Sequence, residues 1–448
     1  MAERVFLVHG WSVKDTTTYQ ALHRQLAANG FHLHDVQLGR YVTLDDHVEI
    51  RDISRALHAA LERELGPTPW TEPFHVVTHS TGAMVVKHWI AHHYVGAFAD
   101  AQPLANVVFL AGPHFGSRLA HHGRSMLAHV AFRGETGHKV LEALELGSAL
   151  SWDLGDLWLD EDRWKKKGVR PFCLIGDRVP RGLDDRLKAR IFPAYFEEGS
   201  DQVIRVPAGN LNFRRYEIDL CTGRRRRVGE VSGVPFGALW RYTHSGSDTG
   251  IMNSIRKRSR PDRHQALGLI LECLRVTGAQ TYARARTRLA EATAETRGKR
   301  DAFAQLDFRF RDEDGRPVTD YKVVLGYVDA DGRARPSGCV VHTHKNRVTP
   351  EHFTAFVRLK DLERGVPFFF EFTADTDTPL VGLTGGRQAI ASGEIDAVVR
   401  ADETTQVDVI VGRHASPKLF VFHSGDDPDL HVAWDREGNV TETGLEWK

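Results

Sequence analysis

Ser80 is the residue of this chain whose type and setting are best suited to covalent chemistry. It lies in residues 76–82 (VVTHSTG), between an apolar strand and an apolar helix. A serine at such a junction can occupy a sharp turn that exposes its Oγ atom. The turn needs small neighbours because strand and helix nearly touch there. Gly82 and Ala83 meet this need, whereas Thr78 stands where glycine is usual. The run therefore predicts a nucleophile at Ser80.

An acid and a histidine that could activate this serine follow it along the chain. Asp201 lies in residues 198–204 (EGSDQVI), and His244 lies in the short segment 242–246 (YTHSG). A serine hydroxyl is a poor nucleophile until a base removes its proton. We predict that His244 is this base and that Asp201 orients its imidazole and stabilises its charged form. Asp177 is the rival acid, because it also ends an apolar strand.

Two backbone N–H groups are predicted to form an oxyanion hole, those of Trp11 and Thr81. Residues 5–8 are a continuous apolar run that leads into His9-Gly10-Trp11. A glycine at a strand end lets the next backbone N–H turn toward a neighbouring site, as an oxyanion hole requires. Thr81 directly follows the candidate nucleophile, which is the usual source of the other N–H group.

The chain order Ser…Asp…His and several short motifs in residues 4–275 resemble those of an α/β-hydrolase, and more narrowly a bacterial lipase or phospholipase. Two residues depart from the family pattern, Thr78 at the first elbow glycine and Gln202 at the glycine after the acid, but neither removes a reacting group. The matching motifs are, in chain order, residues 8–10 (strand, then His-Gly), 78–82 (elbow), 112–117 (GPHFGS), 200–204 (acid motif) and 210–212 (Asn-Leu stretch).

The resemblance implies a serine carboxylic-ester hydrolase that acts on a lipid or acyl-ester substrate through an acyl-enzyme intermediate. It implies no cofactor and no metal. The same triad would also serve an acyltransferase or a thioesterase. Thr78 and Gln202 leave open a further class, a non-catalytic binding protein with the α/β-hydrolase fold.

The elements that must position these residues alternate between apolar strands and amphipathic helices. This alternation predicts an α/β fold with a doubly wound, mostly parallel sheet covered on both faces. The candidate residues fall at the carboxyl ends of strands, where open α/β sheets bind their ligands. Residues 118–168 form an insertion rich in leucine and tryptophan. We expect a helical cap or lid over a hydrophobic pocket there; a packed helical subdomain without a gating role is the alternative.

A second boundary is expected near residue 280, since 448 residues exceed the usual size of one domain. Residues 1–280 would form the catalytic domain. Residues 281–302 lack large apolar side chains and predict an exposed helix or linker. Residues 303–448 contain short alternating runs separated by Asp-Gly turns, which predict an antiparallel β-sandwich as an accessory domain. The sequence does not indicate the role of this domain.

Composition limits the partners. Lysine plus arginine and aspartate plus glutamate both number 59, so net charge predicts no nucleic-acid partner. The cysteines follow no metal pattern, and Cys173 is expected to be a buried thiol.

The basic runs 224–227 and 165–167 could contact anionic lipid head groups at a membrane surface, but a solvated hairpin and helix end are the preferred interpretation. His342 and His344 share one face of a strand without an evident carboxylate or thiolate partner, which is a weak metal signal.

No charged-then-apolar leader precedes the strand at Arg4, and no run approaches the length of a membrane span. We therefore expect a protein that is cytoplasmic as synthesised. Export by a secretion system that does not use a signal peptide remains open. The sequence does not determine the oligomeric state.

Overall fold

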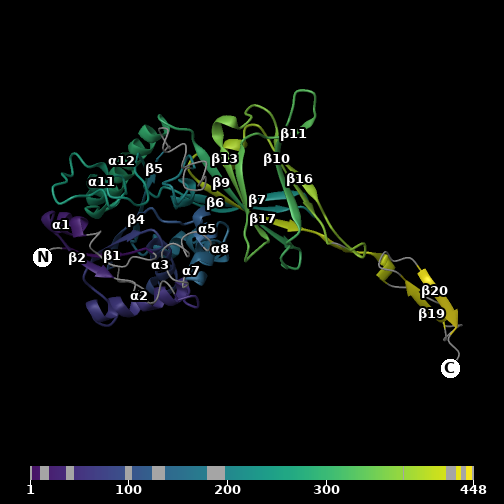
Figure 1. Cartoon of the computed structure of the whole chain (residues 1–448), viewed down its shortest axis with the longest axis horizontal. Helices are drawn as coiled ribbons and strands as arrows, with labels where there is room; N and C mark the ends of the chain where they lie inside the picture. Colours follow the sequence, from purple (N-terminus) through teal and green to yellow (C-terminus); the bar gives the residue numbers. More distant parts are fainter. Residues whose placement is uncertain are drawn as a thin grey trace.

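The fold is described from a computed structural model of the chain. It describes residues 3–10, 20–36, 45–95, 103–123, 137–178, 197–376, 378–419, 430–434 and 440–445. The molecule is elongated, with the N-terminal half at one end, a β-rich body in the middle and a C-terminal hairpin at the far end (Figure 1). No helix of the described part is both long and apolar enough to cross a membrane.

The N-terminal half is built on a six-stranded sheet in which every strand pairing is parallel. Successive residues of a strand point to opposite faces, and both faces are apolar: Phe6 and Val8 belong to one core, Val5 and Leu7 to the other. The strand order is β2 (Phe31–Val36), β1 (Glu3–Val8), β3 (Phe74–His79), β4 (Leu104–Leu110), β5 (Arg170–Asp177) and β8 (Phe236–Trp240).

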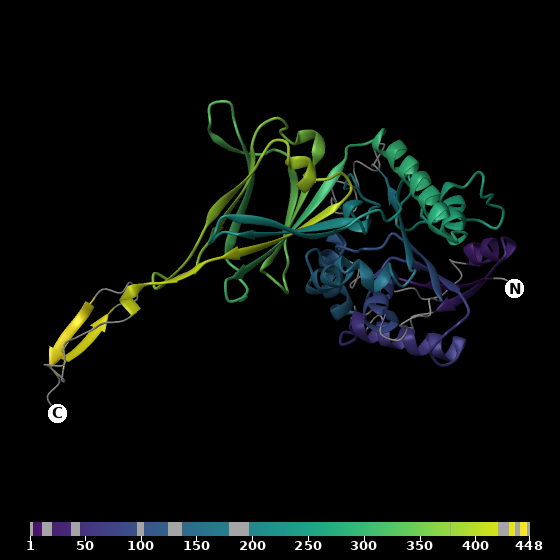
Figure 2. The ribbon, with the colours of Figure 1, turned by 180° about the vertical axis from the view of Figure 1, so that it is seen from behind.

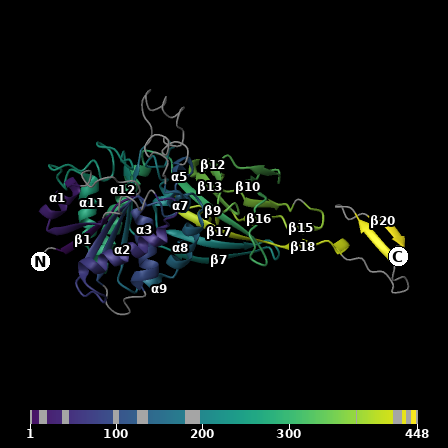
Figure 3. The same ribbon diagram turned by 60° about the horizontal axis from the view of Figure 1, so that its bottom comes forward.

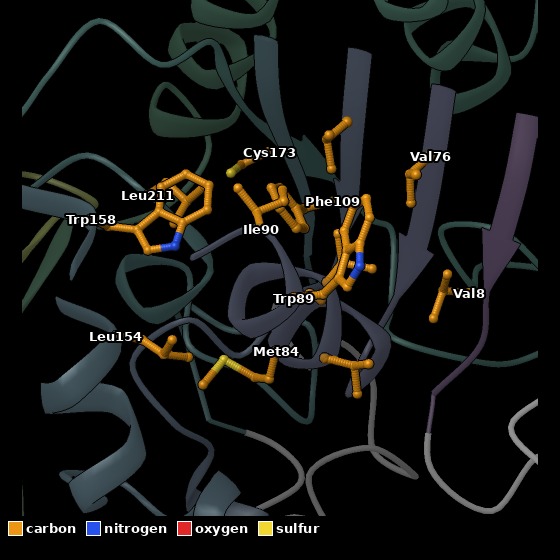
Figure 4. Close-up of a cluster of buried hydrophobic side chains, with 14 of the residues drawn as sticks. Val8, Val76, Met84, Trp89, Ile90, Phe109, Leu154, Trp158, Cys173 and Leu211 are labelled. Atoms are coloured by element: carbon orange, nitrogen blue, oxygen red, sulfur yellow. The ribbon is translucent and has the colours of Figure 1, made fainter. Parts of the chain in front are cut away.

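Helices cover both faces, so the predicted doubly wound sheet is confirmed (Figures 1 and 3). Figure 4 shows the core beneath α3, where side chains from the sheet, from α3 and from the insertion meet. One face packs against α2 (Ile50–Leu65), α3 (Gly82–Trp89), the π-helical segment Ile90–Tyr94 and α8 (Ala149–Leu159). The other packs against α1 (Gln20–Ala28), α11 (Gln265–Leu274) and α12 (Ala279–Arg297).

The described helices of the insertion are α5 (Arg118–Gly123), α7 (His138–Leu144), α8 and α9 (Glu161–Trp164). Leu154, Trp158 and Trp164 are buried in the sheet core rather than held over a pocket. Trp152 of α8 faces the β-rich body, where the guanidinium carbons (Cζ) of Arg215 and Arg309 lie 4.8 and 4.4 Å from its ring centre. These helices therefore join the two halves of the molecule. A cap over the catalytic pocket stays a prediction.

The C-terminal half is a sandwich of two sheets whose facing side chains form a third apolar core. The sandwich is confirmed, but one sheet is mixed rather than antiparallel, because β17 pairs in parallel with both β9 and β6. One sheet has the order β12 (Val340–Lys345), β13 (His352–Arg358), β9 (Phe303–Asp312), β17 (Thr404–Val411), β6 (Phe213–Asp219) and β7 (Arg224–Val231). The other has the order β11 (Ala334–Pro336), β10 (Tyr321–Val328), β14 (Phe368–Ala374) and β16 (Gly386–Ile390).

The hairpin β6–β7 lies within the predicted catalytic range, residues 1–280, yet it forms one edge of the sandwich (Figure 2). Arg214 and Arg215 of this hairpin are buried and bind carboxylates from the predicted accessory range, residues 303–448, namely Glu403 and Asp408. Arg215 also pairs with Asp156 of α8. The two predicted sequence ranges, residues 1–280 and 303–448, thus share a sheet and buried ion pairs.

Helix α12 occupies most of the predicted linker, and the expectation that it is exposed was wrong for one face. Leu289 is buried against β8, the edge strand of the parallel sheet. Thr293 Oγ1 accepts a hydrogen bond from Ala238 N at 3.0 Å, and Thr296 Oγ1 donates one to Ala238 O at 2.8 Å. Threonines on the helix therefore satisfy the free edge of β8, a role that hydrophobic patterning does not reveal.

Short C-terminal elements extend away from the sandwich. Two three-residue strands, β15 (Val381–Leu383) and β18 (Arg413–Ala415), pair with each other, and a second hairpin joins β19 (Leu430–Trp434) to β20 (Val440–Leu445). In Figures 1 and 2 this last hairpin lies far from both halves of the molecule.

Candidate active site

Ser80 lies on the sharp turn between β3 and α3, with the strained backbone angle φ of +56°. Its backbone N–H donates to Leu110 O at 3.0 Å, which ties the turn to β4. Space around the turn is tight: a Cβ atom on Gly82 would lie 2.4 Å from Val8 O, and one on Gly10 would lie 2.7 Å from Ser80 Cβ. Both glycines are therefore required by close approach of β1 to the turn.

The three predicted reacting residues lie in one hydrogen-bonded chain. Asp201 Oδ2 accepts a hydrogen bond from His244 Nδ1 at 2.9 Å, and His244 Nε2 accepts one from Ser80 Oγ at 2.9 Å. A carboxylate can only accept, so the proton sits on Nδ1 and leaves Nε2 free to act as a base. Asp201 is fully buried, whereas Ser80 is partly exposed. These hydrogen bonds thus connect a carboxylate in the interior to an accessible hydroxyl.

A tight turn holds the carboxylate of Asp201. Its Oδ1 atom accepts hydrogen bonds from Val203 N at 2.9 Å and from Ile204 N at 2.7 Å, while Oδ2 is left for His244. These two N–H donors fix the orientation of the carboxylate. The backbone adds a further link, because His244 N donates to Asp201 O at 2.8 Å. Acid and base are therefore positioned by the same contact between their loops.

His79, next to the nucleophile, was missed by the sequence analysis. Burial, together with the neighbouring His244 ring, lowers the pKa of His79 to about 3, so its ring is neutral. Its Nε2 atom donates to His244 O at 3.1 Å. His79 therefore helps to fix the backbone of the predicted base. Its position directly before Ser80 was the only available signal.

Asp177, the rival acid, takes a different partner. Its carboxylate pairs with Arg300, a fully buried side chain that also binds Asp402 at 2.9 Å. The backbone of Asp177 accepts a hydrogen bond from Arg241 N at 2.8 Å, three residues before His244. Asp177 thus links the loop of the predicted base to the C-terminal half. Of the two candidate acids, Asp201 is the one bonded to His244.

The two departures from the family pattern behave differently. Thr78 is fully buried at the end of β3, and its hydroxyl has no hydrogen-bond partner among the described residues. Gln202 has a φ of +81°, in the left-handed region that favours glycine. The family glycine therefore has a physical reason, and Gln202 carries backbone strain that glycine would relieve.

Replacing Gln202 with glycine is expected to raise the free energy of unfolding by roughly 0.5–1 kcal/mol, because relief of the strained φ exceeds the added flexibility of the unfolded chain. Urea unfolding measures the change. Gln388→Gly is the matched control: it makes the same replacement in the extended strand β16, where glycine should instead lower stability by a similar amount. A loss of stability in both variants would contradict a strained Gln202.

The structure describes only one of the two predicted oxyanion donors, Thr81. Trp11 lies outside the described residues. Thr81 directly precedes the first residue of α3. At this amino-terminal end of the helix, backbone N–H groups have no intrahelical acceptor. Its N–H group is therefore of the kind that an oxyanion hole uses, and the role of both residues stays a prediction.

Other predicted sites have ordinary partners. His344 Nε2 binds Glu145 Oε1 at 2.8 Å, an interaction between the sandwich and the insertion. The arginine run lies on the edge strand β7, where Arg225, Arg226 and Arg227 pair with glutamates. No three histidine, cysteine or acidic side chains within the described ranges are arranged to hold a metal ion.

The chain is similar over almost its whole length to phospholipase PlaB from Legionella pneumophila. The two are 25% identical with a TM-score of 0.82, covering 99% of this chain and 100% of that one. The same phospholipase in complex with thio-NAD gives 26% identity and a TM-score of 0.82, covering 98% and 99%. No protein-family model and no curated protein sequence matches the chain. The similarity confirms the predicted α/β-hydrolase fold of the lipase and phospholipase type, with an additional β domain.

Proposed function

We propose that this chain is a serine hydrolase that cleaves carboxylic esters of lipids, of the phospholipase or lipase type. The hydrogen-bonded chain from Asp201 through His244 to Ser80 carries the proposal, because it connects a buried acid, a base with a free Nε2 atom and a partly exposed hydroxyl. The similarity to a phospholipase over nearly the whole chain supports a lipid substrate.

In the proposed reaction, Ser80 Oγ attacks the ester carbonyl carbon while its proton passes to His244 Nε2. Asp201 stabilises the imidazolium that forms. The negative charge on the carbonyl oxygen is held by the backbone N–H of Thr81 and, as predicted, of Trp11. His244 then gives the proton to the leaving alcohol, and a water molecule, activated by the same histidine, releases the acid from the acyl-enzyme.

Hydrolysis of p-nitrophenyl esters of increasing acyl length, together with labelling by a fluorophosphonate, tests this function. We expect turnover that favours long acyl chains, and labelling of the wild type but not of Ser80→Ala. Phosphatidylcholine and phosphatidylglycerol as substrates then separate a phospholipase from a lipase. Neither labelling nor turnover in the folded wild type would instead favour a binding protein with this fold.

A further inference from the structure

A cavity of about 680 Å³ lies at the amino-terminal edge of the parallel sheet. Its walls come from the start of β5, the residues before β8 and the first turns of α12. The proposed active site lies at the opposite edge, since β5 runs for 8 residues from Arg170 at the cavity to Asp177 beside the catalytic loops. At about 3.3 Å per residue, the strand separates Arg170 from Asp177 by about 23 Å.

The charged groups that line this cavity are all basic. Among its described lining residues, Lys165, Arg170 and Arg286 are charged and none is acidic. Lys165 pairs with Glu161 at 2.7 Å. Arg170 and Arg286, in contrast, form no ion pair with any residue that the structure describes. The cavity is therefore lined by two arginines that form no ion pair within the described ranges.

Arg170 is held in place by a buried amide. Asn106 is fully buried, and its Nδ2 atom donates to Leu274 O and Val276 O, both at 2.9 Å. This fixes the Oδ1 atom of Asn106, which accepts a hydrogen bond from Arg170 Nε at 2.8 Å. The terminal nitrogens of Arg170 have no hydrogen-bond partner within the described ranges. A guanidinium oriented through Nε presents its remaining donors as a rigid fork.

Arg286 completes the site from α12. It lies one helical turn after Tyr282, which also lines the cavity and whose hydroxyl is fixed by donation to Pro171 O at 2.9 Å. Arg286 Nη1 lies beside Gly233, another lining residue, where an added Cβ atom would be 3.3 Å away. Partial burial lowers the pKa of Arg170, so its charge is poorly solvated and gains from an anion.

We propose that this cavity is a binding site for a phosphate group, separate from the proposed active site. Two unpaired guanidinium groups match the several oxygens of a phosphate, which arginine binds through paired hydrogen bonds. The same group is present in free phosphate, in small phosphate esters and in the head group of a phospholipid. The proposal does not depend on the proposed function.

Isothermal titration of the full chain at constant ionic strength tests the site with inorganic phosphate and with glycerol 3-phosphate. We expect saturable binding to the wild type and at least tenfold weaker binding to Arg286→Gln and to Arg170→Gln. Arg288→Gln is the matched control, because Arg288 lies on the same helix but pairs with Glu291 and lines a different groove. Equal binding by Arg286→Gln and Arg288→Gln, or no saturable binding, would overturn the site.

Flotation with phosphatidylglycerol vesicles identifies the source of the phosphate. Binding of vesicles that is lost in Arg286→Gln assigns the site to a lipid head group, whereas binding of the soluble probes alone assigns it to a free phosphate. Ester hydrolysis by Arg286→Gln should equal that of the wild type, because Arg286 is exposed and lies at the edge of the sheet opposite Ser80. This readout keeps the test independent of the triad.

Discussion

Replacing Asp201 with asparagine is expected to lower kcat for ester hydrolysis about ten-thousand-fold. Asparagine can keep the two hydrogen bonds that Oδ1 accepts from Val203 N and Ile204 N. Its Nδ2 group, however, donates where the carboxylate accepted. The His244 ring must then carry its proton on Nε2, and that atom no longer accepts from Ser80 Oγ. Steady-state kinetics on a p-nitrophenyl ester measures the loss.

Asp177→Asn is the control for the acid, because it alters the rival residue in the same way. Asp177 pairs with Arg300 rather than with His244, so this variant should lose stability while kcat stays within about tenfold of the wild type. Circular dichroism and urea unfolding show whether each variant is folded. A ten-thousand-fold loss in Asp177→Asn with little change in Asp201→Asn would reverse the two roles.

Replacing Lys87 with methionine is expected to raise the free energy of unfolding at pH 7 by roughly 2–4 kcal/mol. Lys87 lies on α3 and is fully buried, and its Nζ atom has no hydrogen-bond partner in the part of the chain that the structure describes. Its Nζ atom lies 5.1 and 5.9 Å from the ring centres of Phe115 and Trp158, which are favourable contacts for a cation. Burial lowers the pKa of Lys87 from 10.5 to about 7.

The sign of the pH dependence follows from this lowered pKa. Below pH 7 the lysine is charged in both states, so the full cost of burying the charge opposes folding. Between pH 7 and pH 10.5 the folded form loses the proton while the unfolded form keeps it. Stability of the wild type should therefore gain up to about 1.4 kcal/mol per pH unit from this group. Lys87→Met should lack that gain.

Urea unfolding at pH 7 and pH 9 measures both effects. Lys166→Met is the matched control, since Lys166 is exposed at the end of α9 and should change stability by less than about 0.5 kcal/mol. A lower stability of Lys87→Met at pH 7 would show that the ammonium group has an anionic partner and is not an isolated buried charge.

The parts of the site that the sequence predicts are those fixed by local rules. The turn at Ser80 was visible because a buried strand, a serine and small residues follow one another. The choice of Asp201 over Asp177 rested on motif similarity, and the structure adds the hydrogen bond to His244. Lys87 directly follows the apolar run at residues 83–86 and could have been noticed as a buried charge.

What the sequence could not predict depends on contacts between distant segments. Arg300 joins Asp177 to Asp402, and no local pattern links three residues that come from β5, from the end of the linker and from the turn before β17. The hairpin β6–β7 is rich in charged residues, as a surface hairpin would be, and only the pairing with β17 shows that it belongs to the sandwich. The sequence predicted that α12 would be exposed. This was wrong because the buried face of α12 consists of alanine and threonine side chains and a single leucine, which give little hydrophobic signal.

The pairing of β6 with β17 also sets the order in which the chain can fold. Asn210, just before β6, binds the backbone of Asp402, which lies 192 positions later in the chain. During synthesis, the edge of β6 that pairs with β17 stays unpaired until the strand Thr404–Val411 has been made. Such distant parallel pairing forms slowly, because a long loop must close before the contacts form. The loop that carries Asp201 therefore gains its final support late, and a nascent chain that stops before β17 should accumulate as an aggregation-prone intermediate.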